Sequence, residues 1–408
     1  MDRYFVSIDL ENKTCDSLIA FSKRPFINLN FFAAIDRYNG RYFFSGGLPD
    51  RIGNFHIIDL QTLEIQSANF YTGEMEYDPF EEKLYYIKSG SFYSLALSNL
   101  IPVKLSKVFN LNARIFGHVR CYLPQINEYH YLTPEGYLAV IDCKSGNTKC
   151  KIYSRQENAF NPNILTDEIY SVILGSIFVS SDCYRTKRLL TKIPDYKGIV
   201  NAQMAVVDHI HGNYIVPYWA QNDSYKYAVI DIKNGALKKT IEQFCKPAIM
   251  DLQMMYDKPE ALVRIVGDTI FVNKGKLYHW YLNDQLICVT SNNFIIPNQN
   301  GRYKAKVDFK EYSAFTRELI IDNILPHAFE YSIFPTLANE NIKLNFNTCQ
   351  FDAIKIYDLQ GRILLEQSFL QNHTEYQITI DVGFLTKGLY IVNVFHGTKN
   401  HTKKFIKM

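Results

Sequence analysis

The chain has 408 residues, of which 47% are hydrophobic, 14% aromatic and 21% charged, and its formal net charge at pH 7 is +3. This length allows one large domain and a small one, and the near balance of charge excludes an acidic disordered chain and argues against a nucleic-acid partner. No apolar run approaches the roughly 18 residues that a membrane-spanning helix needs, so we expect no transmembrane segment.

One short phrase recurs through the first three quarters of the chain. It consists of two or three apolar residues, an aspartate, an apolar residue and a polar turn, and its aspartates are Asp9, Asp59, Asp142 and Asp231. The spacings of 50, 83 and 89 residues predict degenerate copies in the two longer gaps, near residues 97 and 189, and a further copy lies near residue 283. We interpret each aspartate as a turn residue whose carboxylate caps backbone N–H groups, not as a catalytic group.

A period of 40–50 residues with about four short strands is typical of a β-propeller, because a single blade cannot bury both of its faces and blades therefore stack around an axis. The N-terminal part thus resembles a generic β-propeller repeat protein. Hairpins are expected near residues 9, 59, 97, 142, 189, 231 and 283, which favours seven blades, with six as the alternative. Strands at 302–309 and 314–322 would complete the first blade. We assign the propeller to residues 1–325 and the domain boundary to 324–331.

The segment from 332 to 408 has the pattern of a second, smaller β domain. Apolar and polar residues alternate in 342–346 and in 376–380, as in half-buried strands, and Gln360-Gly361 and His396-Gly397 are turn signals. Several short strands at close spacing predict an immunoglobulin-like β-sandwich. The whole chain is therefore expected to be all-β.

Four motifs in this segment occur in a characteristic order. They are Phe334-Pro335, Asp358-Leu359-Gln360-Gly361, Lys387-Gly388-Leu389-Tyr390 and Lys403-Lys404-Phe405. Together they resemble the type A C-terminal sorting domain of type IX secretion system cargo from Bacteroidota. The opening departs from the usual Tyr-Pro-Asn-Pro of that family, since it reads Phe-Pro-Thr-Leu here.

The resemblance implies a location and a partner. A sorting domain of this kind implies recognition by the type IX secretion machinery and a secreted protein, or one at the outer membrane or cell surface. Such cargo first crosses the inner membrane, yet residues 1–6 show no basic start followed by an apolar segment, so no signal peptide is visible. We therefore expect the N-terminus to be truncated or mis-started, or the leader to have been removed.

The eight cysteines are scattered and form no C-x-x-C pair, which disfavours a zinc ribbon or a thioredoxin-like site. A two-residue turn at Gly146-Asn147 would place Cys143 directly opposite Cys150, within disulfide range. The sequence leaves two readings open for this pair, a disulfide or two reduced thiols on neighbouring strands.

Two interruptions of the blade pattern are candidates for ligand binding. The first contains Asp50 and Arg51, and the second contains Tyr218, Trp219, Asn222 and Asp223. Aromatic rings beside amides and carboxylates suit peptides or sugars, because the ring stacks on the ligand while the polar groups form hydrogen bonds. The alternative is that Trp219 packs between blades and the loops bind nothing.

No catalytic constellation and no metal or cofactor site is expected. His209 and His211 could face one side of a strand, but no third zinc ligand is visible nearby. We therefore predict a non-enzymatic binding module for a protein, peptide or glycan. The alternative is a propeller-fold carbohydrate-active enzyme, a lyase or glycoside hydrolase, which would need clustered acid–base residues near the central channel.

Overall fold

The structure is a computed structural model, and it describes the chain with several gaps. The described residues are 3–9, 12–21, 32–46, 55–70, 72–107, 120–133, 136–153, 158–181, 184–199, 205–242, 256, 258–310, 312–322, 330–346, 351–369, 377–396 and 399–408. Within these ranges every regular element is a β-strand, which confirms the predicted all-β class. A search of the same ranges finds no helix with the length and hydropathy needed to cross a membrane.

The chain divides into two compact units, Met1–Pro259 and Glu260–Met408. The sequence predicts a single domain over residues 1–325 with its boundary at 324–331, and these bounds stay a prediction, but one part of the predicted blade arrangement is wrong. The reason is visible in the pairing of β26 (Leu277–Leu282), which was expected to belong to a seventh blade. It pairs with β29 (Gly301–Asp308), so that the segment predicted to complete the first blade belongs to the second unit instead.

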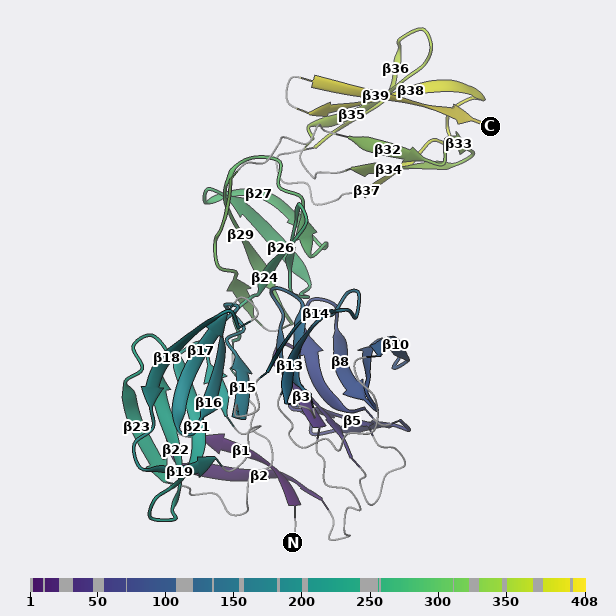
Figure 1. Ribbon diagram of the computed structural model, residues 1–408. Coiled ribbons are helices and arrows are strands. Elements are labelled where there is room, and N and C mark those ends of the chain that lie inside the picture. Colours follow the sequence, from purple (N-terminus) through teal and green to yellow (C-terminus); the bar gives the residue numbers. More distant parts are fainter. Residues whose placement is uncertain are drawn as a thin grey trace. The chain divides into compact units, whose positions relative to one another are not determined.

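The first unit is built from consecutive antiparallel sheets (Figure 1). In the described residues, four of them are meanders in which each strand pairs with the next, and we number the sheets in chain order. The first four contain β3 (Phe32–Asp36), β4 (Arg41–Ser45), β5 (Phe55–Asp59) and β6 (Ile65–Ala68); β7 (Glu74–Asp78), β8 (Lys83–Lys88), β9 (Ser91–Ala96) and β10 (Pro102–Lys107); β11 (Arg120–Leu123), β12 (Glu128–Leu132), β13 (Tyr137–Asp142) and β14 (Thr148–Tyr153); and β15 (Asn158–Pro162), β16 (Ile169–Ile173), β17 (Ser176–Ser181) and β18 (Thr186–Lys192).

The fifth sheet and an N-terminal hairpin complete the described strands of this unit. In the fifth sheet two short strands pair with different parts of one long strand. The elements are β19 (Tyr196–Ile199), β20 (Val206–Asp208), β21 (Asn213–Ala220), β22 (Tyr225–Asp231) and β23 (Leu237–Glu242), and the hairpin is β1 (Arg3–Asp9) with β2 (Thr14–Phe21).

Neighbouring sheets pack face to face and share their cores. Between the second and third sheets, Phe92 lies against Tyr129 with ring centroids 5.3 Å apart. Similar clusters join the first sheet to the second, the third to the fourth and the fourth to the fifth. The inner strands of each sheet are therefore covered on both sides, which explains why β8 and β13 are apolar almost throughout rather than alternating.

The first strands of successive sheets lie side by side. Strand β3 lies beside β7, β7 beside β11, β11 beside β15, and β15 beside β20. Arg120 on β11 joins three of them, because its guanidinium donates to the carbonyl oxygens of Met75 at 3.0 Å and Ala33 at 2.7 Å. Arg37, just after β3, is close enough to lower the pKa of His209, just after β20. The succession of sheets therefore curves back toward its start, as in a propeller-like β fold.

The recurring aspartates cap turns, as the sequence predicted. The Asp59 carboxylate accepts from the backbone N–H groups of Gln61 at 2.8 Å and Thr62 at 2.9 Å. The carboxylates of Asp9, Asp142 and Asp231 accept backbone N–H groups two or three residues further on in the same way. All seven expected hairpins are present, although the turn expected near residue 189 lies earlier, between β17 and β18.

The second unit begins with two small sheets. One contains β24 (Val263–Val266), β25 (Thr269–Val272) and β28 (Phe294–Ile295). The other contains β26 and β29 with β27 (Gln285–Thr290), β30 (Ser313–Phe315) and β31 (Leu319–Ile321). Their strand order is not that of the meanders in the first unit.

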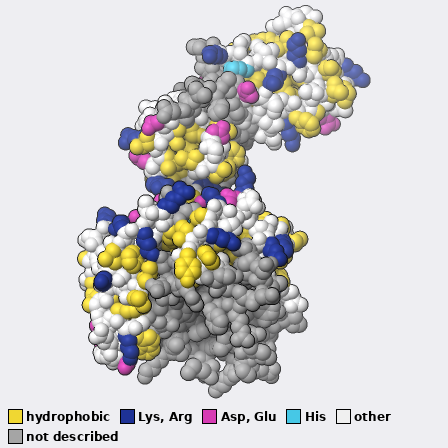
Figure 2. Space-filling view, in the orientation of Figure 1, with side chains coloured by type: hydrophobic (Ala, Val, Ile, Leu, Met, Phe, Trp, Pro, Cys, Tyr) yellow, Lys and Arg dark blue, Asp and Glu magenta, His cyan; other side chains and the backbone are white. Residues whose placement is uncertain are grey.

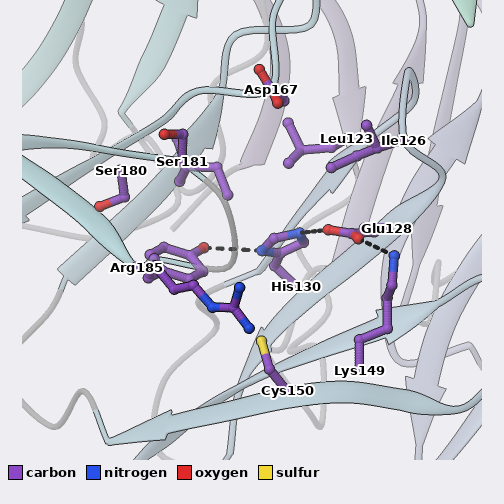
Figure 3. Close-up of a pocket in the computed structure, with 12 residues that line it drawn as sticks. Leu123, Ile126, Glu128, His130, Lys149, Cys150, Asp167, Ser180, Ser181 and Arg185 are labelled. Carbon is purple, nitrogen blue, oxygen red and sulfur yellow. Dashed lines mark hydrogen bonds and ion pairs between the residues drawn. The ribbon is translucent and has the colours of Figure 1, made fainter.

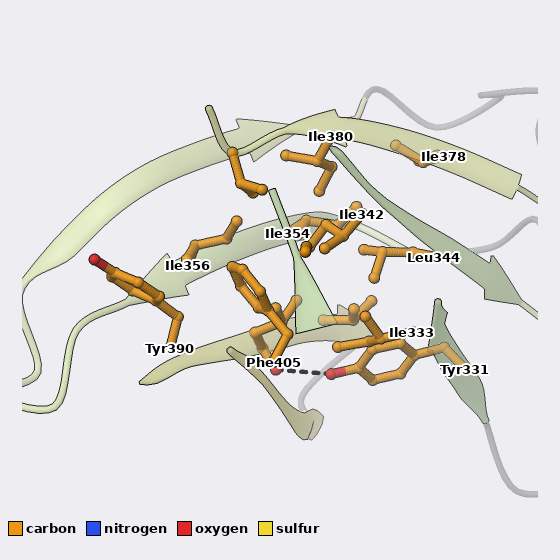
Figure 4. Packing of buried hydrophobic residues seen from close by; sticks show 14 of the residues in the cluster. Tyr331, Ile333, Ile342, Leu344, Ile354, Ile356, Ile378, Ile380, Tyr390 and Phe405 are labelled. Atoms are coloured by element: carbon orange, nitrogen blue, oxygen red, sulfur yellow. Dashed lines mark hydrogen bonds between the residues drawn. The ribbon is translucent and has the colours of Figure 1, made fainter. Parts of the chain in front are cut away.

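The last part of the second unit is a two-sheet sandwich (Figure 4). One sheet has the order β32 (Tyr331–Phe334), β34 (Asn341–Phe346) and β37 (Gln377–Asp381). The other has the order β33 (Leu337–Ala338), β39 (Lys399–Lys407), β38 (Gly388–His396), β35 (Ala353–Tyr357) and β36 (Ile363–Ser368). Alternate residues of the facing strands, such as Ile342 and Leu344 opposite Ile354 and Ile356, form one buried core.

The expected arrangement of Cys143 and Cys150 is wrong. Cys150 pairs with Val140, and Cys143 lies in the turn that leads into β14. The turn is longer than the two residues predicted, since Asp142 and Asn147 close it and the Gly146 N–H donates to the Asp142 carbonyl. Cys143 and Cys150 form no disulfide. Cys15 and Cys288, which the sequence did not single out, each take part in a disulfide bond.

Candidate functional site

A pocket of about 450 Å³ lies between the third and fourth sheets of the first unit (Figure 3). The third sheet contributes residues from the β11–β12 turn, β12 and β14, and the fourth contributes residues from the start of β16 and from the β17–β18 turn. The lining residues are Leu123, Ile126, Glu128, His130, Lys149, Cys150, Asp167, Ile169, Ser180, Ser181, Tyr184 and Arg185.

A chain of hydrogen bonds crosses the pocket. His130 lies at its centre, with Nδ1 3.1 Å from the Tyr184 hydroxyl and Nε2 3.2 Å from Glu128 Oε2. The Lys149 ammonium donates to the other carboxylate oxygen of Glu128 at 2.6 Å. Glu128 and His130 are two residues apart on β12 and so point to the same side of the sheet. Tyr184 comes from the neighbouring sheet, so two sheets must pack together to build the chain.

Burial and hydrogen bonding determine the protonation states of His130 and Glu128. The pKa of His130 is lowered because burial disfavours the imidazolium more than Glu128 stabilises it. For Glu128, burial raises the pKa, but the hydrogen bonds from His130 and Lys149 outweigh it and the net pKa is lowered. A neutral imidazole beside an ionised carboxylate carries its proton on Nε2 and donates it to Glu128. The Nδ1 atom then accepts the Tyr184 O–H.

The chemistry of the pocket follows from these states. Tyr184 presents a phenol hydroxyl whose proton is directed at His130. Arg185 and Asp167 supply charges of both signs, and Leu123 and Ile169 supply apolar surface. A site with mixed polar and apolar lining suits a sugar or a peptide side chain.

The predicted ligand residues of the fifth sheet lie elsewhere. Tyr218 and Trp219 belong to β21, and a short turn, not a long loop, leads from there to β22. Tyr218 is buried, and its hydroxyl donates to Asp195 at 3.0 Å. Trp219 is 40% exposed and meets Tyr225 edge-on at 5.5 Å, so it does not pack between sheets.

The remaining predicted residues at this turn have structural partners. The Asn222 side chain accepts the backbone N–H of Ser224 at 3.2 Å and stabilises the turn. Asp223 forms an exposed ion pair with Lys197. Asp50 and Arg51 lie outside the described residues. The structure thus brings Trp219 and Asp223 to one exposed turn and leaves Tyr218 inaccessible.

The two histidines next to β20 do not share a ligand. The backbone N–H of His209 donates to the Tyr256 hydroxyl at 3.2 Å, and His209 Nδ1 lies 3.2 Å from the same hydroxyl, whereas His211 Nδ1 lies 2.9 Å from the Asp208 carboxylate. Within the ranges that the structure describes, no three His, Cys, Asp or Glu side chains gather as a metal site.

The pocket was not found by sequence reasoning. Its one local signal is the pair Glu128 and His130, whose spacing places both on one face of a strand. Tyr184 lies 54 residues after His130, and nothing in the sequence connects the two. An aspartate-based repeat search also overlooks these positions, because they lie on strands and not in the recurring turns.

The residues of the predicted sorting motifs have clear roles in the sandwich. The Asp358 carboxylate accepts the backbone N–H of Gln360 at 2.9 Å, and Gly361 has φ +80°, so this motif forms a turn. Tyr390 and Phe405 are buried and stack at 5.5 Å.

The other motif residues lie nearer the surface. Phe334, which precedes Pro335, is 69% exposed. Lys387 and Lys404 are exposed, and Gly388 begins β38. The Lys403 ammonium lies over the Tyr331 ring, 5.8 Å from its centroid.

Comparison with known proteins assigns the C-terminal domain. No curated protein matches the chain. One structurally similar solved chain comes from the "Crystal structure of Nidogen/Laminin Complex", with a TM-score of 0.42 and 11% sequence identity over 57% of this chain and 88% of that chain. Residues 332–408 match the family model of the secretion system C-terminal sorting domain, the tail of type IX secretion cargo, which implies that the protein is exported to the cell surface or beyond.

Proposed function

We propose that the protein is an exported binding protein whose first unit is a six-bladed β-propeller that holds a protein, peptide or glycan in the pocket around His130. The sorting domain at residues 332–408 is the observation that carries the export part of this function. The disulfides of Cys15 and Cys288 agree with it, because structural disulfides persist in oxidising compartments outside the cytoplasm.

Two observations support six blades. The first unit has five consecutive sheets in its described part, and the hairpin β1–β2 supplies the outer strands of a sixth. A seventh blade would need the hairpin β26–β27, which belongs to the second unit. The sandwich is proposed to be immunoglobulin-like, because two antiparallel sheets enclose its core.

The sorting motifs divide into two groups under this proposal. Buried Tyr390 and Phe405 stabilise the sandwich, so the secretion machinery cannot touch them in the folded domain. Exposed Phe334, Lys387 and Lys404 are among the motif residues that a partner can contact. We propose these three as the recognition residues.

The pocket is proposed to bind its ligand through the Tyr184 hydroxyl. A panel of immobilised glycans and peptides, screened with the full chain, identifies a binder. Replacing Tyr184 by Phe removes only the hydroxyl, and we expect this change to weaken binding about fivefold, since one hydrogen bond contributes on the order of 1 kcal/mol.

The matched control is Tyr153→Phe, because Tyr153 is 61% exposed on the same third sheet and does not line the pocket. We expect this variant to bind like the wild type. Equal binding by the Tyr184 variant and the wild type would show that the ligand lies elsewhere, with the exposed turn of Trp219 and Asp223 as the next surface to test.

A carbohydrate-active enzyme, a lyase or glycoside hydrolase, is the second candidate. The chain from Tyr184 through His130 to Glu128 favours it, because a hydroxyl that faces a base which is itself oriented by a carboxylate is a common catalytic arrangement. The wild-type protein should then cleave any polysaccharide that it binds and produce new chain ends. The Tyr184→Phe variant should produce none. Binding without cleavage by the wild type would remove this candidate.

A further inference from the structure

Basic residues are concentrated on the outermost strands of four successive sheets in the first unit. These strands are β10, β14, β18 and β23, each the last strand of its sheet. Every charged residue in them is basic except Glu242. We call this set the basic rim, and it comprises Lys104, Lys107, Lys149, Lys151, Lys187, Arg188, Lys192, Lys238 and Lys239.

Most of the rim has positive charge available for a partner. Lys104, Lys107, Lys151, Lys192 and Lys239 are exposed, and none of them forms an ion pair with another described residue. Three other rim residues are paired with acids, Lys149 with Glu128, Arg188 with Glu168 at 3.6 Å and Lys238 with Asp231 at 3.1 Å.

The net charge of the whole chain conceals this asymmetry. The acidic residues of the first unit are used largely in turns, where Asp59, Asp142 and Asp231 accept backbone N–H groups. The outer strands hold almost none. A formal net charge of only +3 therefore coexists with outer strands whose charged residues are almost all basic, and such strands attract polyanions although the average composition does not indicate it.

Close packing makes the rim continuous from sheet to sheet. A Cβ on Gly146, in the β13–β14 turn, would lie 2.9 Å from the Leu105 Cβ of β10. A Cβ on Gly235, in the β22–β23 turn, would lie 2.5 Å from the Leu190 carbonyl oxygen of β18. Strand β10 therefore contacts the β13–β14 turn of the next sheet, and strand β18 contacts the β22–β23 turn of the next sheet. Between these two pairs, Lys149 of β14 and Arg185 before β18 line the same pocket.

Exposed aromatic rings accompany the charges. Tyr137 and Tyr153 are cross-strand partners on β13 and β14, are 42% and 61% exposed, and meet edge-on at 5.5 Å. Lys151 lies two residues from Tyr153 on the same strand. Figure 2 shows Lys and Arg side chains interspersed with hydrophobic ones on the described surface of this unit. A ring face beside a cation suits an acidic sugar, whose C–H groups stack while its anion pairs with the lysine.

We propose that the basic rim binds a linear anionic polysaccharide. A flexible partner fits best, because the rim follows successive sheets around a curved edge and bending a stiff duplex along it costs several kcal/mol. It must be polyanionic, because several unpaired lysines are spread over four sheets. The rim meets the pocket at Lys149, which pairs with Glu128, whereas the five unpaired rim lysines do not line the pocket.

The probe for the test is dextran sulfate, with uncharged dextran of the same length as the reference, and the full chain as the protein. Binding is measured between about 50 and about 200 mM salt. We expect binding to dextran sulfate only, with affinity falling as salt rises because bound counterions are released. A variant with Lys104, Lys107, Lys151 and Lys239 changed to Gln should bind more than about tenfold more weakly.

A matched variant removes the same charge elsewhere. It changes Lys276, Lys310, Lys343 and Lys399 to Gln, all exposed lysines of the second unit, and it should bind within about twofold of the wild type. An equal loss in both variants would attribute binding to net charge and overturn the proposal. So would an absence of binding at the lowest salt, since edge lysines that only prevent strand pairing between molecules need no ligand. Tighter binding of single-stranded DNA of equal charge would also overturn it.

Discussion

At the scale of single residues, burial governs the charge state of His209. Burial lowers the pKa of this histidine to about 3, the Arg37 charge acts in the same direction, and Asp208 opposes both. Its imidazole also meets the Tyr256 ring edge-on, with ring centroids 4.7 Å apart. Because the pKa is lower in the folded state, the unfolded chain binds more protons between pH 3 and about pH 6.5.

The free energy of unfolding should therefore decrease as pH is lowered through this window. At pH values above about 6.5 the contribution of neutral His209 is fully present, and it is lost by up to about 1.4 kcal/mol per pH unit as pH falls. Urea denaturation at several pH values measures this slope. His209→Asn, which keeps a polar atom near the Tyr256 hydroxyl, should flatten this slope. An unchanged slope in the His209 variant would contradict this assignment.

At this scale, a contact could be predicted from the sequence when its two residues are close together along the chain. The turn aspartates were identified because each accepts N–H groups two or three residues away. The Tyr184–His130 contact joins residues 54 positions apart and has no local pattern. Tyr218 was expected at a surface but is buried, because a strand residue's exposure is set by the neighbouring sheet and not by its own sequence.

At the scale of elements, the turn caps are the clearest link between repeat and structure. Asp59→Ala removes the acceptor for the Gln61 and Thr62 N–H groups and should lower the free energy of unfolding by about 1 kcal/mol. Asp59→Asn keeps an acceptor oxygen and should cost less than about half of that. Thermal or urea unfolding of both variants makes the comparison, and equal losses would mean that charge, not capping, stabilises the turn.

The hairpins were predictable, but the pairing of distant strands was not. Apolar runs ending in Asp predicted four of the hairpins from residues close in the chain, and their spacing predicted the others. The 302–309 segment was assigned to the first sheet because its pattern is that of any strand, whereas it pairs with β26. Alternation specifies which face of a strand is buried, and it leaves the identity of the partner open.

At the scale of the first unit, Arg120 couples three sheets. Its guanidinium donates to carbonyls of β3 and β7 and lies 3.3 Å from Glu76. Arg120→Gln should lower the free energy of unfolding of this unit by about 2–4 kcal/mol, since it removes charge-assisted hydrogen bonds in a buried place. Arg362→Gln is the control, because the Arg362 side chain is 75% exposed and its ion pair should contribute less than about 1 kcal/mol. Similar losses in both variants would show that Arg120 does not connect the sheets.

The domain organisation shows what a repeat can and cannot specify. The period of the turns predicted stacked sheets, which the first unit has. The same period extended across residue 260, because a hairpin of the second unit happens to share its pattern. The C-terminal domain was identified from the order of its motifs, and the family match covers the same residues, 332–408.

At the scale of the whole molecule, the sorting tail is the part that is proposed to direct export. The sandwich has its own core within residues 331–405, so residues 330–408 can be fused to a reporter that carries a signal peptide. In a bacterium with a type IX secretion system, we predict that the fused reporter appears on the cell surface or in the medium and that the reporter without the tail stays in the periplasm. Retention of the fused reporter in the periplasm would contradict the account.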